Sequence, residues 1–335
     1  MRKDKMAKKN SPKVSVGMPV YNGEEHISHA LDSILGQTFG DFELIICDNA
    51  STDATWEICR DYEKRDRRIL CLRNSVNLGA APNYNRVFAA SSGRYFKWAA
   101  HDDVLCPDFF EKCVAALDAA PDAALCRSRV EYIDEKGKSL GVYDSPLKGS
   151  DSSSPSRRFA ALVLNEHPSN DFFGLIRRKF LEGSLLHGSY HGADRALLAE
   201  LALCGRLIQI REPLLRMRER PDRYTRSMRL PRERAAWHDS KQSKRPGLPL
   251  LRCFADFLRA AFRRADDRVV SFKCLWHLAR WWFVNWNFLR MATEMIGLVY
   301  PNVIPMAEDF KRKRFGPPQG PLALKKKKQK TTGSP

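Results

Sequence analysis

Three short segments of the chain place polar side chains directly after apolar runs, at residues 19–24, 47–53 and 101–103. The last segment, His101-Asp102-Asp103, has two adjacent carboxylates, which hard cations such as Mg²⁺ and Mn²⁺ take as ligands together with phosphate oxygens. The same pair can instead cap a helix, because an aspartate there accepts hydrogen bonds from unpaired backbone N–H groups. Polar groups after apolar strands are the arrangement that a nucleotide site needs.

The elements around these segments alternate between short apolar runs and helical periodicity. The expected strands are residues 14–20, 42–47, 69–72 and 95–99, and the helices between them are 27–35, 52–65 and 82–90. Such an order predicts a parallel sheet with right-handed crossovers. Ligands of these sheets bind outside the carboxyl ends of the strands, which is where the three polar segments meet.

The second half of the chain continues with less regular alternation. A helix is expected at 108–120, strands at 123–130 and 172–177, a hairpin around 135–137, and a helix from Gly192 through Leu203. Residues 144–156 are rich in Ser, Pro, Gly and Asp and indicate a mobile loop, and residues 232–249 are polar and indicate a linker.

The net charge of +18 is concentrated at the ends of the chain. Residues 1–13 carry +5, residues 311–335 carry +9 and residues 206–234 carry +6, which leaves the remainder at −2. Basic tails of this kind bind polyanions non-specifically, lie on anionic membrane, or are simply solvated. Because the body of the protein is near neutral, no specific nucleic-acid partner is expected.

Nine cysteines, an odd number without a CxxC pair, favour a reduced, cytoplasmic compartment without disulfides or a zinc site. The first ten residues lack an apolar stretch, so no secretory signal is expected. Residues 275–300 are aromatic but too polar to span a bilayer. On one helix their polar residues would share a narrow stripe, leaving an aromatic face that either lies on the inner face of the membrane or packs on the domain or a second subunit.

Segments of the first 130 residues resemble inverting glycosyltransferases of family 2 in sequence order. They are Val-Gly-Met-Pro-Val-Tyr-Asn-Gly-Glu, Ile-Ile-Cys-Asp-Asn-Ala-Ser-Thr-Asp, Asn77-Leu-Gly-Ala, Gly93-Arg-Tyr-Phe-Lys-Trp and His101-Asp102-Asp103. A weaker resemblance continues to about residue 220. It implies a GT-A fold, a Rossmann-like α/β sheet that is mixed but mostly parallel and is flanked by helices, at 14–230. A helical extension at 231–310 and basic tails at 1–13 and 311–335 complete the expected organisation.

The resemblance also implies which residues bind a nucleotide-sugar donor, with UDP favoured. Tyr21 would pack on the base, or else belong to the core. Asp103 would ligate Mg²⁺ or Mn²⁺ on the diphosphate, and Asp102 would hold the ribose or a water of the metal shell. The remaining donor-binding residues implied are Pro19, Asn22, Glu24, Asp48 and Asn83. Relatives often carry a histidine where this chain has Arg220, which can contact phosphate directly.

Asp194 matches the acidic residue that the family places under the acceptor. As a general base it would take the proton of the attacking hydroxyl, with inversion at the sugar. Alternatively it only caps the following helix, and His191 and Glu200 are then the next candidate bases. The expected acceptor is a glycan, a lipid-linked sugar or a polysaccharide.

Two other functions fit the sequence less well. A nucleotidyltransferase would need a Gly-rich, Lys-bearing phosphate loop after the first strand, and residues 19–24 lack one. A non-catalytic adaptor that binds polyanions or membrane on a degenerate transferase fold would explain the basic tails. The carboxylates needed for chemistry are nevertheless all present.

Overall fold

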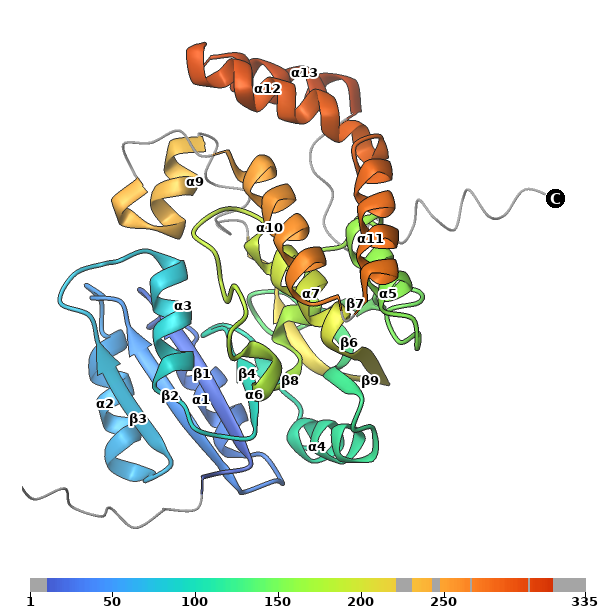
Figure 1. Cartoon of the computed structure of the whole chain (residues 1–335). Coiled ribbons are helices and arrows are strands. Elements are labelled where there is room, and N and C mark those ends of the chain that lie inside the picture. The colour runs from blue at the N-terminus through green and yellow to red at the C-terminus, as the bar shows by residue number, and fades with distance from the viewer. Residues whose placement is uncertain (1–10, 221–230, 243–247, 266, 301, 316–335) are drawn as a thin grey trace, which may run out of the picture.

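The structure is a computed structural model that describes residues 11–220, 231–242, 248–265, 267–300 and 302–315 (Figure 1). Most of the two expected basic tails, and the Arg-rich residues 221–230, lie outside the described residues.

The first half of the chain forms the parallel sheet that its alternation predicts. Its strands are β1 (Val14–Val20), β2 (Phe42–Asp48), β3 (Ile69–Arg73) and β4 (Tyr95–Trp98), and its helices are α1 (Ile27–Leu35), α2 (Thr55–Arg65) and α3 (Ala80–Ala89). Strand β1 pairs in parallel with both β2 and β4. Helix α2 begins three residues later than expected because Thr52 and Asp53 hydrogen-bond to the loop after β1.

The second half adds antiparallel strands and makes the sheet mixed. Its elements are β5 (Val104–Leu105), α4 (Phe109–Ala119), β6 (Ala123–Ile133), β7 (Ser139–Tyr143), α5 (Pro155–Val163), β8 (Leu175–Arg177), α6 (Arg178–Leu181), α7 (Ala193–Cys204) and β9 (Arg206–Arg218). The strand order is β3-β2-β1-β4-β8-β6-β9-β5, and β7 pairs with β6 through the expected hairpin. Residues 172–173, expected in a strand, belong instead to the 3₁₀ helix η1 (Asn170–Phe173), because turn hydrogen bonds hold Phe172 and Gly174.

Two apolar cores lie on opposite faces of the sheet. Side chains alternate along each strand, so Leu44 and Ile46 of β2 face one core while Ile45 and Cys47 face the other. Helices α1, α2 and α4 cover the first face. The second face is covered by α3, α5, α7, α10 (Pro249–Arg263) and α11 (Arg268–Trp281) (Figure 1). All nine cysteines are free thiols, and seven of them are buried in these cores.

The prediction of a linker at 232–249 was wrong for the first half of that range. Helix α9 (Pro231–His238) and the 3₁₀ helix η2 (Ser240–Gln242) occupy it and pack against the start of α3. Ser240 N donates to Leu78 O at 3.1 Å. Gly79, with φ +89°, approaches this segment so closely that an added Cβ would lie 2.6 Å from the Cα of Asp239. Tertiary contact therefore orders a segment that looks irregular by composition.

We expect Gly79→Ala to lower the free energy of unfolding by at least about 1–3 kcal/mol, since its backbone conformation is strained for alanine and its Cβ would strike backbone. Chemical denaturation would measure this. Gly137→Ala is the control, because Gly137 also has a positive φ (+81°) but an added Cβ would meet nothing within 4 Å. Equal losses in the two variants would show that the α9 contact contributes nothing.

The aromatic region at 275–300 is not one helix. Helix α10 (Pro249–Arg263) and α11 (Arg268–Trp281) are followed by the 3₁₀ helix η3 (Val284–Trp286), α12 (Asn287–Val299) and α13 (Val303–Phe315). Asn285 and Trp286 have left-handed backbones and break the helix, so the single polar stripe expected from the sequence does not exist. Within the described residues, no helix is long and apolar enough to cross a membrane.

Candidate active site

The loops after β1 and β2 are bound together by hydrogen bonds. Asn22 Oδ1 accepts from Thr52 N at 2.9 Å, and Glu24 Oε2 accepts from Ala54 N at 2.9 Å. Gly23 N donates to Thr55 Oγ1 at 2.7 Å. The polar residues after the two strands thus form one rigid unit at the carboxyl edge of the sheet.

Tyr21 lies at the end of β1 with 43% of its surface exposed. The alternative that Tyr21 belongs to the core is therefore wrong, and its ring is accessible to a base. Pro19, two residues earlier, is buried in β1 beside Cys47 of β2. Pro19 can shape the strand exit, while Tyr21 is the exposed group of this loop.

Asp48 and Asn83 are buried, at 0% and 2% exposure. Asp48 accepts from Ser51 N at 3.0 Å and forms an ion pair with Arg73 at 2.9 Å. Asn83 donates to Cys47 O at 2.8 Å and accepts from Asn74 at 3.1 Å. Both side chains hold the loops in place, and their direct contact with a donor stays a prediction.

The Asp102-Asp103 pair is held by the end of β9. Asp103 Oδ1 accepts from Arg218 N at 3.1 Å, and Asp102 forms an ion pair with Arg220 at 3.4 Å. The Arg218 guanidinium also donates to the main-chain oxygens of Asp102, Asp134 and Glu135. The helix-cap alternative for the pair is wrong, because α4 begins at Phe109 with Asp108 at its N-cap position.

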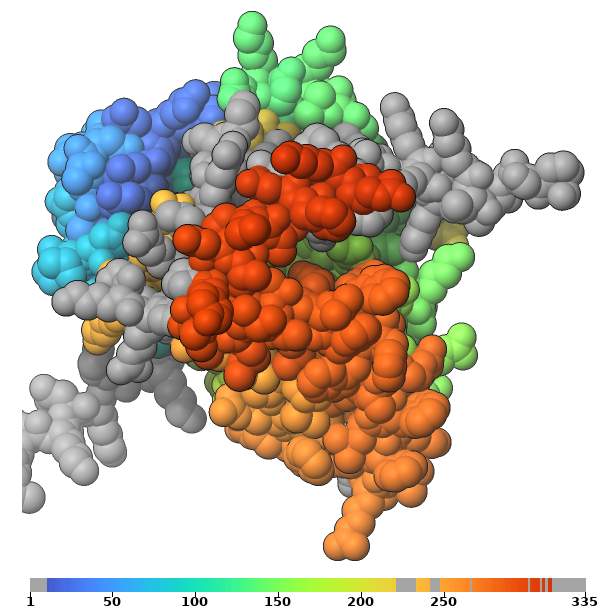
Figure 2. Space-filling model, turned by 90° about the horizontal axis from the view of Figure 1, so that it is seen from above, coloured from blue at the N-terminus to red at the C-terminus, as the bar shows by residue number. Residues whose placement is uncertain are grey.

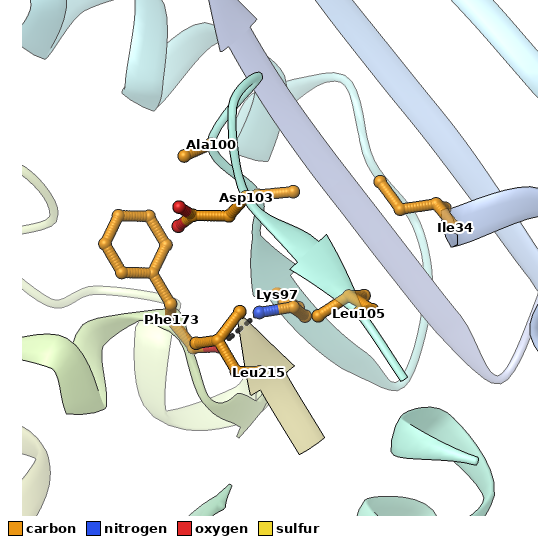
Figure 3. Close-up of a pocket in the computed structure, with 8 residues that line it drawn as sticks. Ile34, Lys97, Ala100, Asp103, Leu105, Phe173 and Leu215 are labelled. Carbon is orange, nitrogen blue, oxygen red and sulfur yellow. Dashed lines mark hydrogen bonds between the residues drawn. The ribbon is translucent and has the colours of Figure 1, made fainter. Parts of the chain in front are cut away.

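A buried lysine lies beneath the pair and was missed by sequence reasoning. Lys97 and Asp103 line one small cavity of about 10 Å³ with Phe173 and Leu215 (Figure 3). The Lys97 ammonium donates to Phe173 O and lies 4.7 Å from the centre of the Phe109 ring. Burial lowers the pKa of Lys97 to about 8, against opposing effects of Cys113 and Asp103. The sequence feature that could have indicated this buried lysine is its position inside the apolar strand Tyr95–Trp98.

His101 joins the acidic turn to the first loop. A Cβ added at Gly23 would lie 2.6 Å from the His101 ring, so only glycine allows this approach. Burial lowers the pKa of His101, and the charges of Arg220 and His26 lower it further, while Asp102 opposes them. The imidazole is therefore neutral at neutral pH and packs as a spacer between the two loops.

Asp194 lies in the first turn of α7. The N-cap position is Gly192, with φ +95°, so Asp194 is not the N-cap residue, although its carboxylate accepts a hydrogen bond from the first turn of the helix. Its Oδ1 accepts from Arg195 N at 2.8 Å, and the positive end of the helix dipole stabilises its charge. Burial lowers the pKa of the neighbouring His187, against the charge of Asp194.

The loop before Asp194 is tied to two other parts of the molecule. Asn85 of α3 exchanges two hydrogen bonds, each 3.0 Å long, with the main chain of His187. The His238 ring of α9 stacks on His187 at 6.0 Å and lies 6.2 Å from His191. These contacts bring α3, α9 and the start of α7 together around the candidate base.

The two other candidate bases differ in accessibility. Glu200 is fully buried, pairs with Arg264 at 2.8 Å and accepts from Leu185 N at 3.0 Å. Its carboxylate is therefore committed to structure and cannot serve an acceptor. His191 is exposed, three residues before Asp194, and stays a candidate.

The acidic turn fits a divalent cation that is shared with phosphate. Across the described ranges, no three His, Cys, Asp or Glu side chains are grouped so that they could hold a metal. Mg²⁺ commonly binds through one or two carboxylates and completes its shell with substrate phosphates and water. Asp103, with Asp102 next to it, offers such a partial ligand set.

This mixed sheet, with polar loops at its carboxyl edge and an acidic turn after β4, has the GT-A fold. Residues 15–201 match the family model described as Glycosyl transferase family 2. That span is more than half of the chain, which therefore belongs to glycosyltransferase family 2.

Relatives support the same class over part of their length. An uncharacterized glycosyltransferase of Haemophilus influenzae is 34% identical over 142 residues, 42% of this chain and 43% of the relative. One from Methanocaldococcus jannaschii is 33% identical over 133 residues, 39% of this chain and 46% of the relative. The chain thus matches less than half the length of these relatives.

Solved structures share the fold at low sequence identity. Residues 1–349 of Staphylococcus aureus TarS, in complex with UDP-GlcNAc, give a TM-score of 0.59 at 17% identity, covering 81% of this chain and 72% of the TarS 1–349 chain. The mannosyltransferase PcManGT of Pyrobaculum calidifontis, in complex with GDP-Man and Mn²⁺, has a TM-score of 0.54 at 18% identity, covering 91% of this chain and 80% of that one.

Proposed function

We propose that this glycosyltransferase moves a sugar from a nucleotide-sugar, with UDP-sugars favoured, to a hydroxyl of a glycan, lipid-linked or polysaccharide acceptor, with inversion. The observation that carries the proposal is the Asp102-Asp103 turn, held by Arg218 and Arg220. The nucleotide-sugar complexes of TarS and PcManGT support a nucleotide-sugar as the donor. The expected working place is the cytoplasm, at the inner face of the membrane.

Each part of the donor meets a different group of this chain. Tyr21 is exposed for stacking on the base, and the loop held by Asn22, Glu24 and Asp48 surrounds the ribose. Asp103 would hold Mg²⁺ or Mn²⁺, and Asp102 would hold the ribose or a water of the metal shell. The bound cation would offset negative charge on the departing diphosphate. Arg220 adds a fixed positive charge beside Asp102.

Asp194 acts on the acceptor. Its carboxylate takes the proton from the acceptor hydroxyl while that oxygen attacks the anomeric carbon. Attack comes from the face opposite the nucleotide, so the configuration at this carbon inverts. Asp194 lies at the N-terminal end of α7, where the positive end of the helix dipole favours negative charge.

The proposal is tested with a panel of UDP-, GDP- and dTDP-sugars, measuring release of free nucleotide with Mn²⁺ or Mg²⁺ and again after EDTA. We expect release from UDP-sugars, with turnover falling at least about 10³-fold when the metal is removed, because the diphosphate leaving group loses its counter-charge. Release from GDP-sugars alone would correct the nucleotide. No release from any donor would favour the non-catalytic adaptor.

A further inference from the structure

Helix α12 has one face fixed against the protein. Its Glu294 carboxylate accepts hydrogen bonds from the backbone N–H groups of Leu250 and Leu251 at the start of α10. Asn287, Met291 and Gly297 lie on the same side and are buried. The inward face of α12 is therefore partly polar and is set by contacts with its neighbours.

The opposite face of α12 is apolar and exposed. It consists of Phe288, Leu289, Ala292, Met295, Ile296 and Val299, which recur at helical spacing. Val299 is 71% exposed and Met295 and Leu289 are each 50% exposed. A helix on the surface of a protein in water ordinarily turns such a face inward, so this arrangement is inverted.

The apolar surface extends past both ends of α12. The η3 break presents Phe283 and Trp286, which are 77% and 66% exposed, and Tyr300 is 69% exposed. We name the outer face of α12 together with these three residues the apolar edge. Figure 2 shows the C-terminal helices, coloured orange and red, at the surface of the molecule as seen from above.

Exposed cations lie on the same C-terminal helices as the apolar edge. Residues 268–315 contain eight Lys or Arg and three Asp or Glu. The exposed cations include Lys273, Arg280, Arg290, Lys313 and Arg314. Two copies of this chain joined through a two-fold contact would bring these like charges together, whereas an anionic surface would neutralise them.

We propose that the apolar edge docks the protein on a bilayer surface that carries anionic headgroups. The aromatic side chains of η3 and α12 enter the boundary between headgroups and acyl chains, and the surrounding cations meet lipid phosphates. Apolar insertion together with a basic patch gives the two signals that reversible anchoring needs. The proposal does not depend on the sugar-transfer chemistry.

The test is flotation of the full chain with phosphatidylcholine vesicles, with and without phosphatidylglycerol. We expect the bound fraction to require phosphatidylglycerol and to fall with added salt. In the double variant Phe283→Ser and Trp286→Ser, vesicle affinity should fall at least about tenfold. The matched control is Val76→Ser with Leu140→Ser, two exposed apolar residues outside the apolar edge.

The outcomes separate the alternatives. Unchanged flotation of the Phe283/Trp286 variant would assign membrane binding to the basic tails and overturn the proposal. The proposal would also be overturned if the chain floated with neither vesicle. Light scattering would then determine the oligomeric state, and a dimer would make the apolar edge a contact between two copies of the chain. Melting temperature checks folding, and unchanged nucleotide release from the variant separates docking from catalysis.

Discussion

Replacing Asp103 by alanine is expected to remove metal-dependent binding of UDP and to lower sugar transfer by at least about 10³-fold, since metal stabilisation of a leaving group is worth several kcal/mol. The reason is that Asp103 is the carboxylate proposed to hold the cation, and Arg218 N fixes its orientation. Calorimetry of UDP with Mn²⁺ and with EDTA measures the first effect. Single-turnover transfer measures the second.

Asp103 is buried, so the alanine variant also loses a structural hydrogen bond. Asp103→Asn keeps a carbonyl oxygen for Arg218 N but removes the charge, and it should show the same loss of metal dependence. Asp122→Ala is the control, because Asp122 pairs with Arg206 near the start of β6 and β9. Equal UDP affinity with and without Mn²⁺ in the unmodified protein would contradict the metal role of Asp103.

Asp194→Asn should lower single-turnover transfer by roughly 10²- to 10⁴-fold while leaving UDP affinity near its original value. Asparagine keeps the size of the side chain and an acceptor for Arg195 N, but it cannot take a proton. Because Asp194 lies in the first turn of α7, loss of its charge removes a favourable interaction with the helix dipole of about 0.3–1 kcal/mol. A melting curve measures that smaller effect on the same protein.

The control for Asp194 is Asp267→Asn, which makes the same exchange at the start of α11. Asp267 caps that helix by accepting from Val269 N, and asparagine caps about equally well. Its transfer rate should be unchanged. If the Asp194→Asn variant also transferred sugar at the normal rate, Asp194 would not be the general base. His191 would then be tested next, because the Glu200 carboxylate is paired with Arg264.

The sequence by itself determined the sheet that carries the site. Strand Val14–Val20, helix Ile27–Leu35 and strand Phe42–Asp48 follow from periodicity within a few residues, which is a local property. The parallel order then required the loops after β1, β2 and β4 to share one edge, so these loops could be chosen without coordinates. Within them, the family resemblance named Tyr21, Asp48 and Asp103.

Tertiary structure decided which of the named groups are available. Asp103 depends on Arg218, 115 residues away, and Glu200 is neutralised by Arg264, 64 residues away. Composition does not predict these pairings, because the packing of segments that are distant in the sequence determines which charged and polar groups come into contact. Periodicity defines the faces of a helix but not which face packs against the protein. The apolar face of α12 therefore points outward only because Glu294, on the opposite face, accepts hydrogen bonds from the start of α10.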